Sequence, residues 1–354
     1  MGKFKCEKIG FIGLGNMGSP MAFNLATWLH EEGKPALTLW NRTASKLPPA
    51  SEKIAHATSA RELARTCDVV ITSLANDEAA QAVYDELFEG AKDKKAARGE
   101  AGEERATIFV ETSTLYPRLS GELERKAAKI PWCFYLQAPV FGPPPLAKEA
   151  KLIVVLSGDI FAKRHVESIL VPSMGRKIID VGANVERASS FKLLGNSVVL
   201  GVIELLAESF TLADASGVGA DLLYEGFIKE FLPAPSFIGY GKKILENSFD
   251  GETGFTATGG LKDAQHIRRL AMENGATVPA LDVAHRHLVT AIANGGGDLD
   301  WSALVAGPRL AAGLSPFTGR KEHPQDTGFG SKSNETAGSL EPESVGGIKE
   351  VRNF

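Results

Sequence analysis

From Lys8 to Leu25 the chain reads K-I-G-F-I-G-L-G-N-M-G-S-P-M-A-F-N-L, and this stretch predicts the fold of its first half. Lys8–Ile12 is typical of a short buried strand, and Met21–Leu25 begins a helical pattern. The motif G-x-G-x-x-G lies between them. Its first glycine permits a tight turn, its second lets the backbone approach a pyrophosphate, and its third lets the helix pack against the strand.

Glycine-rich turns can also serve packing alone, but a position between a strand and a helix favours dinucleotide binding. The start of the helix offers free N–H groups and the positive end of the helix dipole to phosphates. We therefore expect the whole turn to bind the cofactor, through Gly13, Leu14, Gly15, Asn16, Met17 and Gly18.

The residues after the second expected strand indicate which dinucleotide is bound. Leu37–Trp40 is followed by Asn41, Arg42 and Thr43, with no acidic residue at this point. An acid here would hold the ribose 2′-hydroxyl of NAD, whereas an arginine accommodates the 2′-phosphate of NADP. Arg42 can bind a phosphate through two hydrogen bonds, and Thr43 can donate its hydroxyl. We expect NADP as the cofactor, with a solvated loop arginine as the alternative.

Composition argues against several other classes of protein. The formal net charge is −4, and the basic residues are scattered, so we expect no nucleic-acid and no membrane partner. The 3 cysteines and 7 histidines have no metal-ligand spacing, so we expect no metal. Few cysteines suit a reducing compartment, and the first strand begins where a signal peptide would lie. We expect a cytoplasmic location.

Residues 1–182 alternate β-rich runs with helical stretches, which predicts an α/β, Rossmann-type dinucleotide-binding domain with a mostly parallel sheet covered by helices on both faces. Ala91–Ala106 has no apolar periodicity, and we expect a solvated insertion or helix extension there. The expected strands are Lys8–Ile12, Leu37–Trp40, Val69–Ser73, Ile108–Glu111, Cys133–Leu136, Leu152–Ser157 and Lys177–Asp180.

Residues 183–316 show helical patterns without convincing strands and predict an all-α domain for substrate binding and dimerisation. The first helix, Glu186–Ala215, would be about 45 Å long, and helices of that length bridge domains or protomers. We expect a homodimer or homotetramer formed through this domain. Residues 317–354 are poor in large apolar residues and predict a disordered tail. The further expected helices are Leu222–Phe231, Gly260–Asn274 and Ala280–Asn294.

Lys192 and Asn196 lie four residues apart in the long helix, so their side chains share one face. A lysine on a largely apolar helix between domains is unfavourable unless it is paired or used in chemistry. In a reductase it can give a proton to the carbonyl oxygen as hydride reaches the carbon, and Asn196 can orient it. A lysine that snorkels at a helix edge is the alternative, and the residues alone leave both open.

The chain resembles the β-hydroxyacid dehydrogenase family, which includes 3-hydroxyisobutyrate dehydrogenases and glyoxylate/succinic semialdehyde reductases. Four motifs carry this resemblance in the family's order, across roughly residues 8 to 310. The resemblance implies an NAD-binding domain like that of 6-phosphogluconate dehydrogenase followed by an all-α domain. It also implies that Lys192 and Asn196 are catalytic and that Lys262 reaches the cofactor. The motifs are the extended fingerprint Phe11–Leu25, the substrate loop Gln137–Pro143, the catalytic helix Ser189–Asn196 and the pair Lys262-Asp263.

Smaller matches to the family imply three more cofactor contacts. Leu74 and Ala75 follow the third expected strand, where the family's loop contacts the dinucleotide. Thr114 belongs to a turn that matches the family's S-T-x-x-P pattern beside the nicotinamide. Without the resemblance, these residues would be ordinary loops at the end of a sheet.

The substrate loop departs from the family's pattern D-A-P-V-S-G-G. Phe141 replaces the serine, and three prolines follow Gly142. Proline has no N–H, and an anion-binding loop needs successive N–H groups. Gln137 also replaces the acid, and Gly195 replaces the first asparagine of the family's N-N pair.

We therefore expect Phe141, Gly142 and Asn196 to line a site for an apolar or aromatic aldehyde or ketone. The alternative is a standard small hydroxy acid whose carboxylate is held by Lys192 or Arg118. Other aromatic candidates for the pocket are Phe231, Phe237 and Tyr240.

Together these expectations describe an NADPH-dependent oxidoreductase that reduces a small-molecule aldehyde or ketone reversibly to the alcohol. Two alternatives stay open. An imine reductase shares the scaffold, but such enzymes usually lack the lysine that this chain keeps as Lys192. A non-catalytic NADP-binding interaction protein would not need Lys192 and Asn196.

Overall fold

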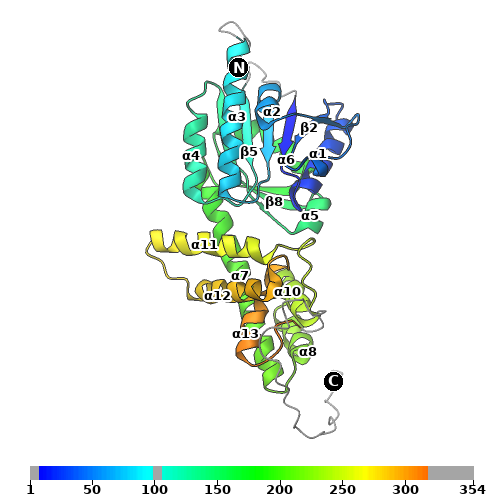
Figure 1. Ribbon diagram of the computed structural model, residues 1–354, viewed down its shortest axis with the longest axis vertical. Helices are drawn as coiled ribbons and strands as arrows, with labels where there is room; N and C mark the ends of the chain where they lie inside the picture. The colour runs from blue at the N-terminus through cyan, green and yellow to red at the C-terminus, as the bar shows by residue number, and fades with distance from the viewer. Residues whose placement is uncertain (1–7, 99–105, 318–354) are drawn as a thin grey trace, which may run out of the picture.

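Residues 8–182 fold around a nine-stranded mixed sheet with helices on both faces (Figure 1). The structure is a computed structural model that describes residues 8–98 and 106–317. The strand order is β3-β2-β1-β4-β5-β6-β8-β7, and β9 pairs with β8. The strands are β1 Ile9–Ile12, β2 Leu37–Trp40, β3 Ile54–His56, β4 Val69–Thr72, β5 Thr107–Glu111, β6 Cys133–Gln137, β7 Val140–Phe141, β8 Leu152–Gly158 and β9 Gly175–Asp180.

Alternate side chains of the strands build two cores, one on each face of the sheet. Phe11 and Ile71 pack with α1 and α6, whereas Ile12, Val70 and Phe109 pack with α2, α3 and α4. The bounds of the helices in this domain are α1 Gly18–Glu31, η1 Ala44–Lys46, α2 Ala60–Thr66, α3 Asp77–Arg98, α4 Pro117–Ala127, α5 Pro144–Lys148 and α6 Ile160–Ser173.

The order of the strands positions the candidate site. β1 lies between β2 and β4, so the chain changes direction across the sheet at β1, and ligands of such folds bind beyond the carboxyl ends of the strands at this point. The sheet is parallel from β3 to β6, as expected, while β8 pairs antiparallel with both β6 and β7. The domain is Rossmann-like with a mixed edge.

The second half of the described chain is helical and is organised around α7, Val185–Ala215, which has 31 residues. Figure 1 shows α7 leaving the sheet domain and running through the other helices. Its buried side chains, among them Leu200, Ile203 and Phe210, belong to the core of this helical region. The remaining helices are α8 Ala220–Leu223, η2 Tyr224–Ile228, α9 Lys229–Phe231, α10 Pro235–Leu245, α11 Ala257–Glu273, α12 Pro279–Ala291, η3 Ile292–Gly296, η4 Trp301–Val305 and α13 Ala306–Ala311.

Two segments bear on the sequence-based expectations. For Ala91–Ala106, the expected helix extension agrees with the end of α3, but the segment is not solvated throughout, because Lys94 is only 5% exposed. Its Nζ donates to Asp68 Oδ1 at 2.9 Å and to the carbonyl of Cys67, so pairing compensates its burial. Phe317, expected to begin the tail, is buried against Phe249. Residues 99–105 and the rest of the expected tail lie outside the described residues.

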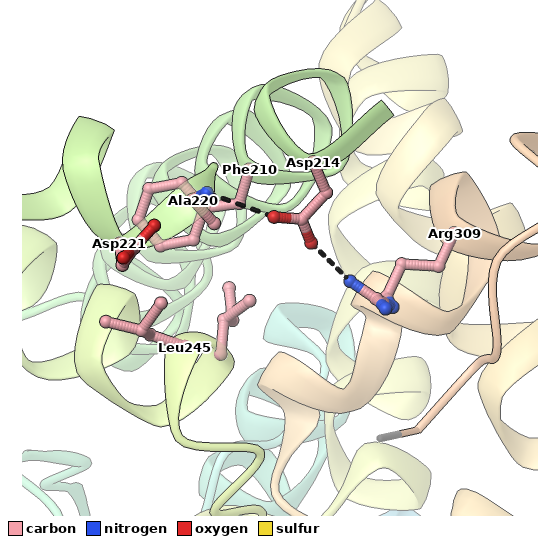
Figure 2. A pocket seen from close by; sticks show the side chains of 7 residues that line it. Phe210, Asp214, Ala220, Asp221, Leu245 and Arg309 are labelled. Atoms are coloured by element: carbon pink, nitrogen blue, oxygen red, sulfur yellow. Dashed lines mark hydrogen bonds and ion pairs between the residues drawn. The ribbon is translucent and has the colours of Figure 1, made fainter. Parts of the chain in front are cut away.

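A cavity of about 200 Å³ lies in the helical region between α7, α8, α10 and α13. Figure 2 shows Asp214 at its edge, where the carboxylate accepts the Ala220 N–H at 3.0 Å and an Arg309 N–H at 2.9 Å. Because Arg309 is already paired, its charge is not available to an anionic ligand. Within the described ranges, no helix combines the length and apolar character that a membrane span needs.

Candidate active site

The turn after β1 has the three steric properties that its glycines predict. Gly13 has a φ of +97°, and a Cβ there would lie 2.0 Å from the Ser73 carbonyl oxygen. A Cβ on Gly18 would lie 1.8 Å from the Gly13 oxygen, so α1 packs tightly on the turn. A Cβ on Gly15 would meet no protein atom within 4 Å. The backbone at Gly15 is thus open on the side where a pyrophosphate would approach.

Asn41 joins this turn to the end of β2. Its Oδ1 accepts the Leu14 N–H at 2.9 Å, and its Nδ2 donates to the Thr43 carbonyl at 2.8 Å. Arg42 and Thr43 are exposed beside it, and Arg42 makes no ion pair with another described residue. These residues fit a nucleotide with a 2′-phosphate, because the cation is available and no carboxylate stands at the strand end.

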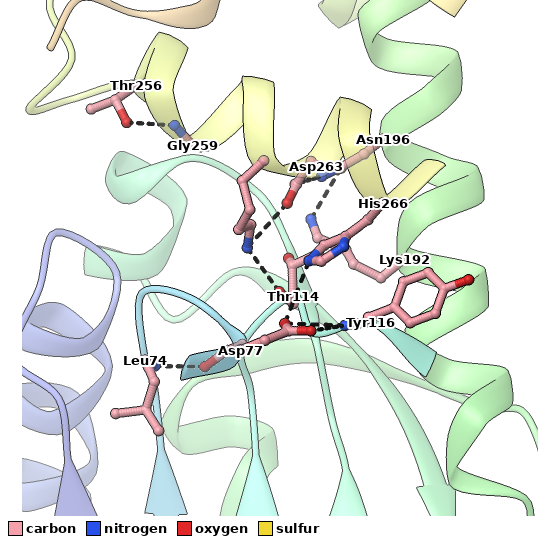
Figure 3. Close-up of polar contacts among 12 residues, drawn as sticks. Leu74, Asp77, Thr114, Tyr116, Lys192, Asn196, Thr256, Gly259, Asp263 and His266 are labelled. Carbon is pink, nitrogen blue, oxygen red and sulfur yellow. Dashed lines mark hydrogen bonds and ion pairs between the residues drawn. The ribbon is translucent and has the colours of Figure 1, made fainter. Parts of the chain in front are cut away.

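The loops after β4 and β5 meet beside this turn. The Leu74 N–H donates to Ser113 Oγ at 2.5 Å, and Ala75 is exposed next to it. The Thr114 carbonyl accepts a hydrogen bond from Lys262 Nζ at 2.8 Å, which brings α11 to the sheet edge. Lys262 thus contacts the Thr114 turn, and Leu74 is bonded to the adjacent Ser113. Figure 3 shows Leu74 and Thr114 on these loops at the sheet edge; their contact with a cofactor stays a prediction.

Glu111, at the end of β5, holds these loops in place, and no motif of the sequence marks it. The side chain is completely buried; its Oε1 accepts the Ser113 N–H at 2.6 Å and its Oε2 accepts the Thr72 hydroxyl at 2.8 Å. Desolvation raises the pKa of Glu111 to about 7, although these hydrogen bonds oppose the shift. Glu111 thereby fixes the turn that carries Thr114.

Lys192 and Asn196 form the centre of the site on α7. Lys192 Nζ donates to Asn196 Oδ1 at 3.1 Å, and Asn196 Nδ2 donates to Asp263 Oδ2 at 2.6 Å (Figure 3). The second oxygen of the fully buried Asp263 lies 3.1 Å from Lys262 Nζ. Two lysines and one carboxylate thus share this chain of contacts, and Lys192 turns into the site, unlike a snorkelling lysine.

Desolvation lowers the pKa of Lys192 to about 8. Asp263 opposes this shift because it stabilises the ammonium, and Lys262 adds to it through repulsion. A lysine with such a pKa can exchange a proton near neutral pH, as a general acid must.

One face of α11 holds the turn of Tyr116 against the helical region. Residues Lys262, His266, Arg269 and Glu273 follow at helical spacing, and we call them the α11 clamp. His266 Nε2 lies 3.4 Å from Asp77 Oδ1, whose carboxylate accepts the Tyr116 N–H at 3.3 Å.

The far end of the α11 clamp holds the Tyr116 side chain itself. The Arg269 guanidinium lies 4.0 Å from the ring centroid, and the Tyr116 hydroxyl donates to Glu273 Oε2 at 2.5 Å. No motif of the sequence predicts a role for Tyr116, His266 or Glu273. Their regular spacing on α11 could have marked one polar face, but not the tyrosine it binds.

The segment expected as a substrate loop is a strand followed by a short helix. β7 pairs with β8 and places Phe141, half-buried, with its ring centroid 4.3 Å from Lys192 Nζ. Gly142 turns the chain with a φ of +133°, and α5 then begins with Pro143 as its N-cap. Because prolines also occupy the first turn of α5, this helix start offers no N–H group from them to a carboxylate.

The other aromatic candidates lie elsewhere. Phe231 is 71% exposed and stacks on Phe227, while Tyr240 accepts the Trp301 indole N–H at 3.0 Å. Phe237 packs against the helical core. Among the aromatic contacts of the described residues, the Phe141 ring pairs only with Phe191. The expectation that these three rings line one pocket with Phe141 is therefore not supported.

Two further observations concern possible ligand-binding groups. Arg118, the alternative carboxylate ligand, is exposed and pairs with Glu122 at 3.1 Å. Across residues 8–98 and 106–317, no three His, Cys, Asp or Glu side chains group closely enough to hold a metal ion.

Comparison with known proteins agrees with this geometry. The model of the family "NAD binding domain of 6-phosphogluconate dehydrogenase" matches residues 8–182. The chain is 32% identical over 302 residues to the uncharacterized oxidoreductase YfjR of Bacillus subtilis, which covers 84% of this chain and 98% of that protein. It is 26% identical over 303 residues to glyoxylate/succinic semialdehyde reductase 1 of Arabidopsis thaliana, with 84% and 97% covered.

A solved structure of Mycobacterium tuberculosis 3-hydroxyisobutyrate dehydrogenase with L-serine superposes with a TM-score of 0.68 at 26% identity, covering 86% of this chain and 100% of that one. Fold, site and relatives together define an NAD(P)-binding oxidoreductase. The chain belongs to the β-hydroxyacid dehydrogenase family, whose members include the 3-hydroxyisobutyrate dehydrogenases and the glyoxylate/succinic semialdehyde reductases.

Proposed function

We propose that this protein is an NADPH-dependent reductase that converts an uncharged aldehyde or ketone reversibly into the alcohol. One observation carries the proposal. Lys192 Nζ is held by Asn196 at 3.1 Å, with its pKa lowered to about 8. Asn196 and Asp263 connect it to Lys262, which donates to the Thr114 carbonyl in the turn where the dinucleotide would end.

The bound nicotinamide would supply the hydride to the carbonyl carbon. Lys192, as the ammonium, donates its proton to the oxygen, so that the alcohol and a neutral lysine result. Asn196 keeps the ammonium in place through its Oδ1, because Asp263 fixes the orientation of the amide from its other side. In the reverse direction the neutral amine accepts the proton of the alcohol.

The proposed preference for NADPH is based on the residues that follow β2. The exposed Arg42 lies beside Thr43, and the 2′-phosphate would find a cation and a hydroxyl there. A carboxylate at this position would favour NADH instead, and the strand end has none.

The proposal that the substrate is uncharged is based on β7 and the start of α5. The Phe141 ring stands next to Lys192, and the prolines of α5 remove backbone donors that would bind a carboxylate. A site of this kind gains affinity by covering apolar surface.

The test is NADPH oxidation measured across paired aldehydes and ketones, with cyclic imines included. We expect turnover of carbonyl compounds by the wild type and a loss of about 10²-fold or more in kcat for Lys192→Ala, the size expected when a general acid is removed. Tryptophan fluorescence titration should show that the variant still binds NADPH. Near-normal kcat in Lys192→Ala, turnover of imines alone, or binding of NADPH without any turnover would each refute the proposal.

A further inference from the structure

The residues at positions 141 and 195, which both depart from the family pattern, are neighbours in the structure. Phe141 stands where the family has serine, and Gly195 stands where it has asparagine. A Cβ built on Gly195 would lie 2.4 Å from Cζ and 2.5 Å from Cε1 of the Phe141 ring. Carbon atoms cannot approach this closely, so the ring occupies a volume that exists only because residue 195 has no side chain.

The same ring contacts the proposed proton donor. The Lys192 ammonium lies over the Phe141 face, 4.3 Å from its centroid, which is within the range of a cation–π interaction. The backbone of Phe141 is fixed by its pairing with Ile153 of β8, and its ring packs against Phe191 with the two ring planes 70° apart. Phe191 and the backbone at Gly195 thus adjoin the ring that the ammonium faces.

Few charges compete with the ring for this ammonium. Asp263 of α11 attracts it through the Asn196 amide, and Lys262 of the same helix repels it. On the sheet side, Glu111 is buried beneath the Ser113 turn, and its field acts on Lys262. The only contact that α7 itself adds is the Asn196 oxygen, which is neutral.

We propose that Phe141 is a positioning residue that holds Lys192 in its protonated form, and that Gly195 is required because it admits the ring. The inference rests on the proposed role of Lys192 as proton donor. The ring replaces, in part, the solvation that the ammonium loses on burial, so its removal makes the charged form less favourable.

The test measures the titration of Lys192 without turnover. Trace acetic anhydride is reacted with the apo protein over a pH series, and the extent of acetylation of each lysine is read from its peptide by mass spectrometry. Phe141→Leu keeps an apolar side chain but removes the aromatic face. In this variant we expect the midpoint of the curve of Lys192 acetylation against pH to fall by about half to one pH unit. Gly195→Ala should lower it as well, because the new methyl group displaces the ring.

Combining the two changes adds a sharper expectation. Leucine ends before the ring atoms that a Cβ at 195 would meet, so Gly195→Ala should have little further effect in a Phe141→Leu background. Phe191→Leu is the matched control, since it removes a neighbouring ring that does not face the ammonium. Circular dichroism of each variant shows whether the fold is retained.

An unchanged Lys192 midpoint in Phe141→Leu, or an equal fall in Phe191→Leu, would overturn the inference. If Gly195→Ala fails to fold, as a changed circular dichroism spectrum would show, Phe141→Leu decides alone. The proposed function is tested separately by the turnover of Lys192→Ala. If that variant retains turnover, the proposed function fails, whatever the acetylation experiment shows.

Discussion

At the scale of single residues, Lys192 links structure to a pH dependence with a definite sign. In the proposed mechanism reduction needs the Lys192 ammonium, so with a pKa of about 8 the rate of reduction should be constant at lower pH and fall about tenfold per pH unit above. Alcohol oxidation needs the free amine and should rise with pH through the same range. Stopped-flow rates of the chemical step in both directions test this. If the rates of reduction and oxidation changed with pH in the same direction, a group other than Lys192 would be responsible.

Arg42 is the residue that should set the choice of cofactor. We expect NADPH to be preferred over NADH by at least about tenfold in kcat/KM, or roughly 1.4 kcal/mol. Arg42→Ala should weaken use of NADPH and leave use of NADH nearly unchanged, because only NADPH carries the 2′-phosphate. Steady-state kinetics with each cofactor measure this, and Lys46→Ala is a control for loss of charge nearby. Equal losses with both cofactors would contradict the assignment.

At the scale of elements, β7 and the start of α5 together predict which substrates are preferred. An uncharged aromatic or medium-chain aldehyde should have a higher kcat/KM than glyoxylate or succinic semialdehyde, since Phe141 offers apolar surface worth about 1.5–3 kcal/mol when covered. Phe141→Ser combined with Pro143→Gly restores a hydroxyl and an N–H, and should shift the preference toward the acids. Matched aldehydes with and without a carboxylate provide the measurement. A wild type that already favours carboxylates would show that the anion is bound elsewhere.

The α11 clamp should act on cofactor binding more than on chemistry. Tyr116→Phe removes the hydrogen bond to Glu273 and loosens the turn that carries Thr114. We expect the KM for NADPH to rise about threefold to tenfold, as for loss of one hydrogen bond, with kcat within about twofold of the wild type. Arg268→Gln, on the same helix but paired with Asp282, is the control. A fall in kcat at unchanged KM would assign the clamp to the chemical step instead.

The elements that sequence could predict are those with a strong local pattern. The glycine turn and α7 depend on neighbours along the chain, and α7 begins and ends within one residue of its expected bounds. β3 and β7, with 3 and 2 residues, are too short to show a period and form only because a neighbouring strand is in place. Tyr116 and Glu111 escaped prediction for a related reason. Tyr116 is bound by Glu273 of α11, 157 residues away in the chain, and Glu111 by Thr72 of β4, 39 residues away.

At the scale of the whole molecule, α7 carries an apolar stripe that a second copy of the chain would cover. Leu194, Val198, Leu205 and Leu212 are each more than half exposed, and the last three recur every seven residues. Exposed apolar rows of this kind mark interfaces, and seven-residue spacing suits a facing helix. We propose a homodimer, or a tetramer built from it, through this stripe.

Light scattering after size-exclusion chromatography tests this assembly. Val198→Glu combined with Leu205→Glu should give a monomer, because two carboxylates would be buried without partners. Met272→Glu is a matched control, since this exposed apolar residue lies on α11, away from the stripe. Wild-type protein that runs as a monomer, or a control that dissociates equally, would refute the stripe as the interface.

The contact between Gly195 and the Phe141 ring also constrains evolutionary history. A family member with serine at position 141 and asparagine at position 195 that gained the ring first would have to hold it away from Lys192, because side chain and ring would need the same volume. The contact with the ammonium therefore requires that the asparagine be lost before the phenylalanine is acquired, and the reverse route loses the ring first. Of the two intermediates, the one with serine and glycine is the favourable one. Reconstructed ancestors, and libraries that vary both positions, should contain that combination and lack phenylalanine with asparagine.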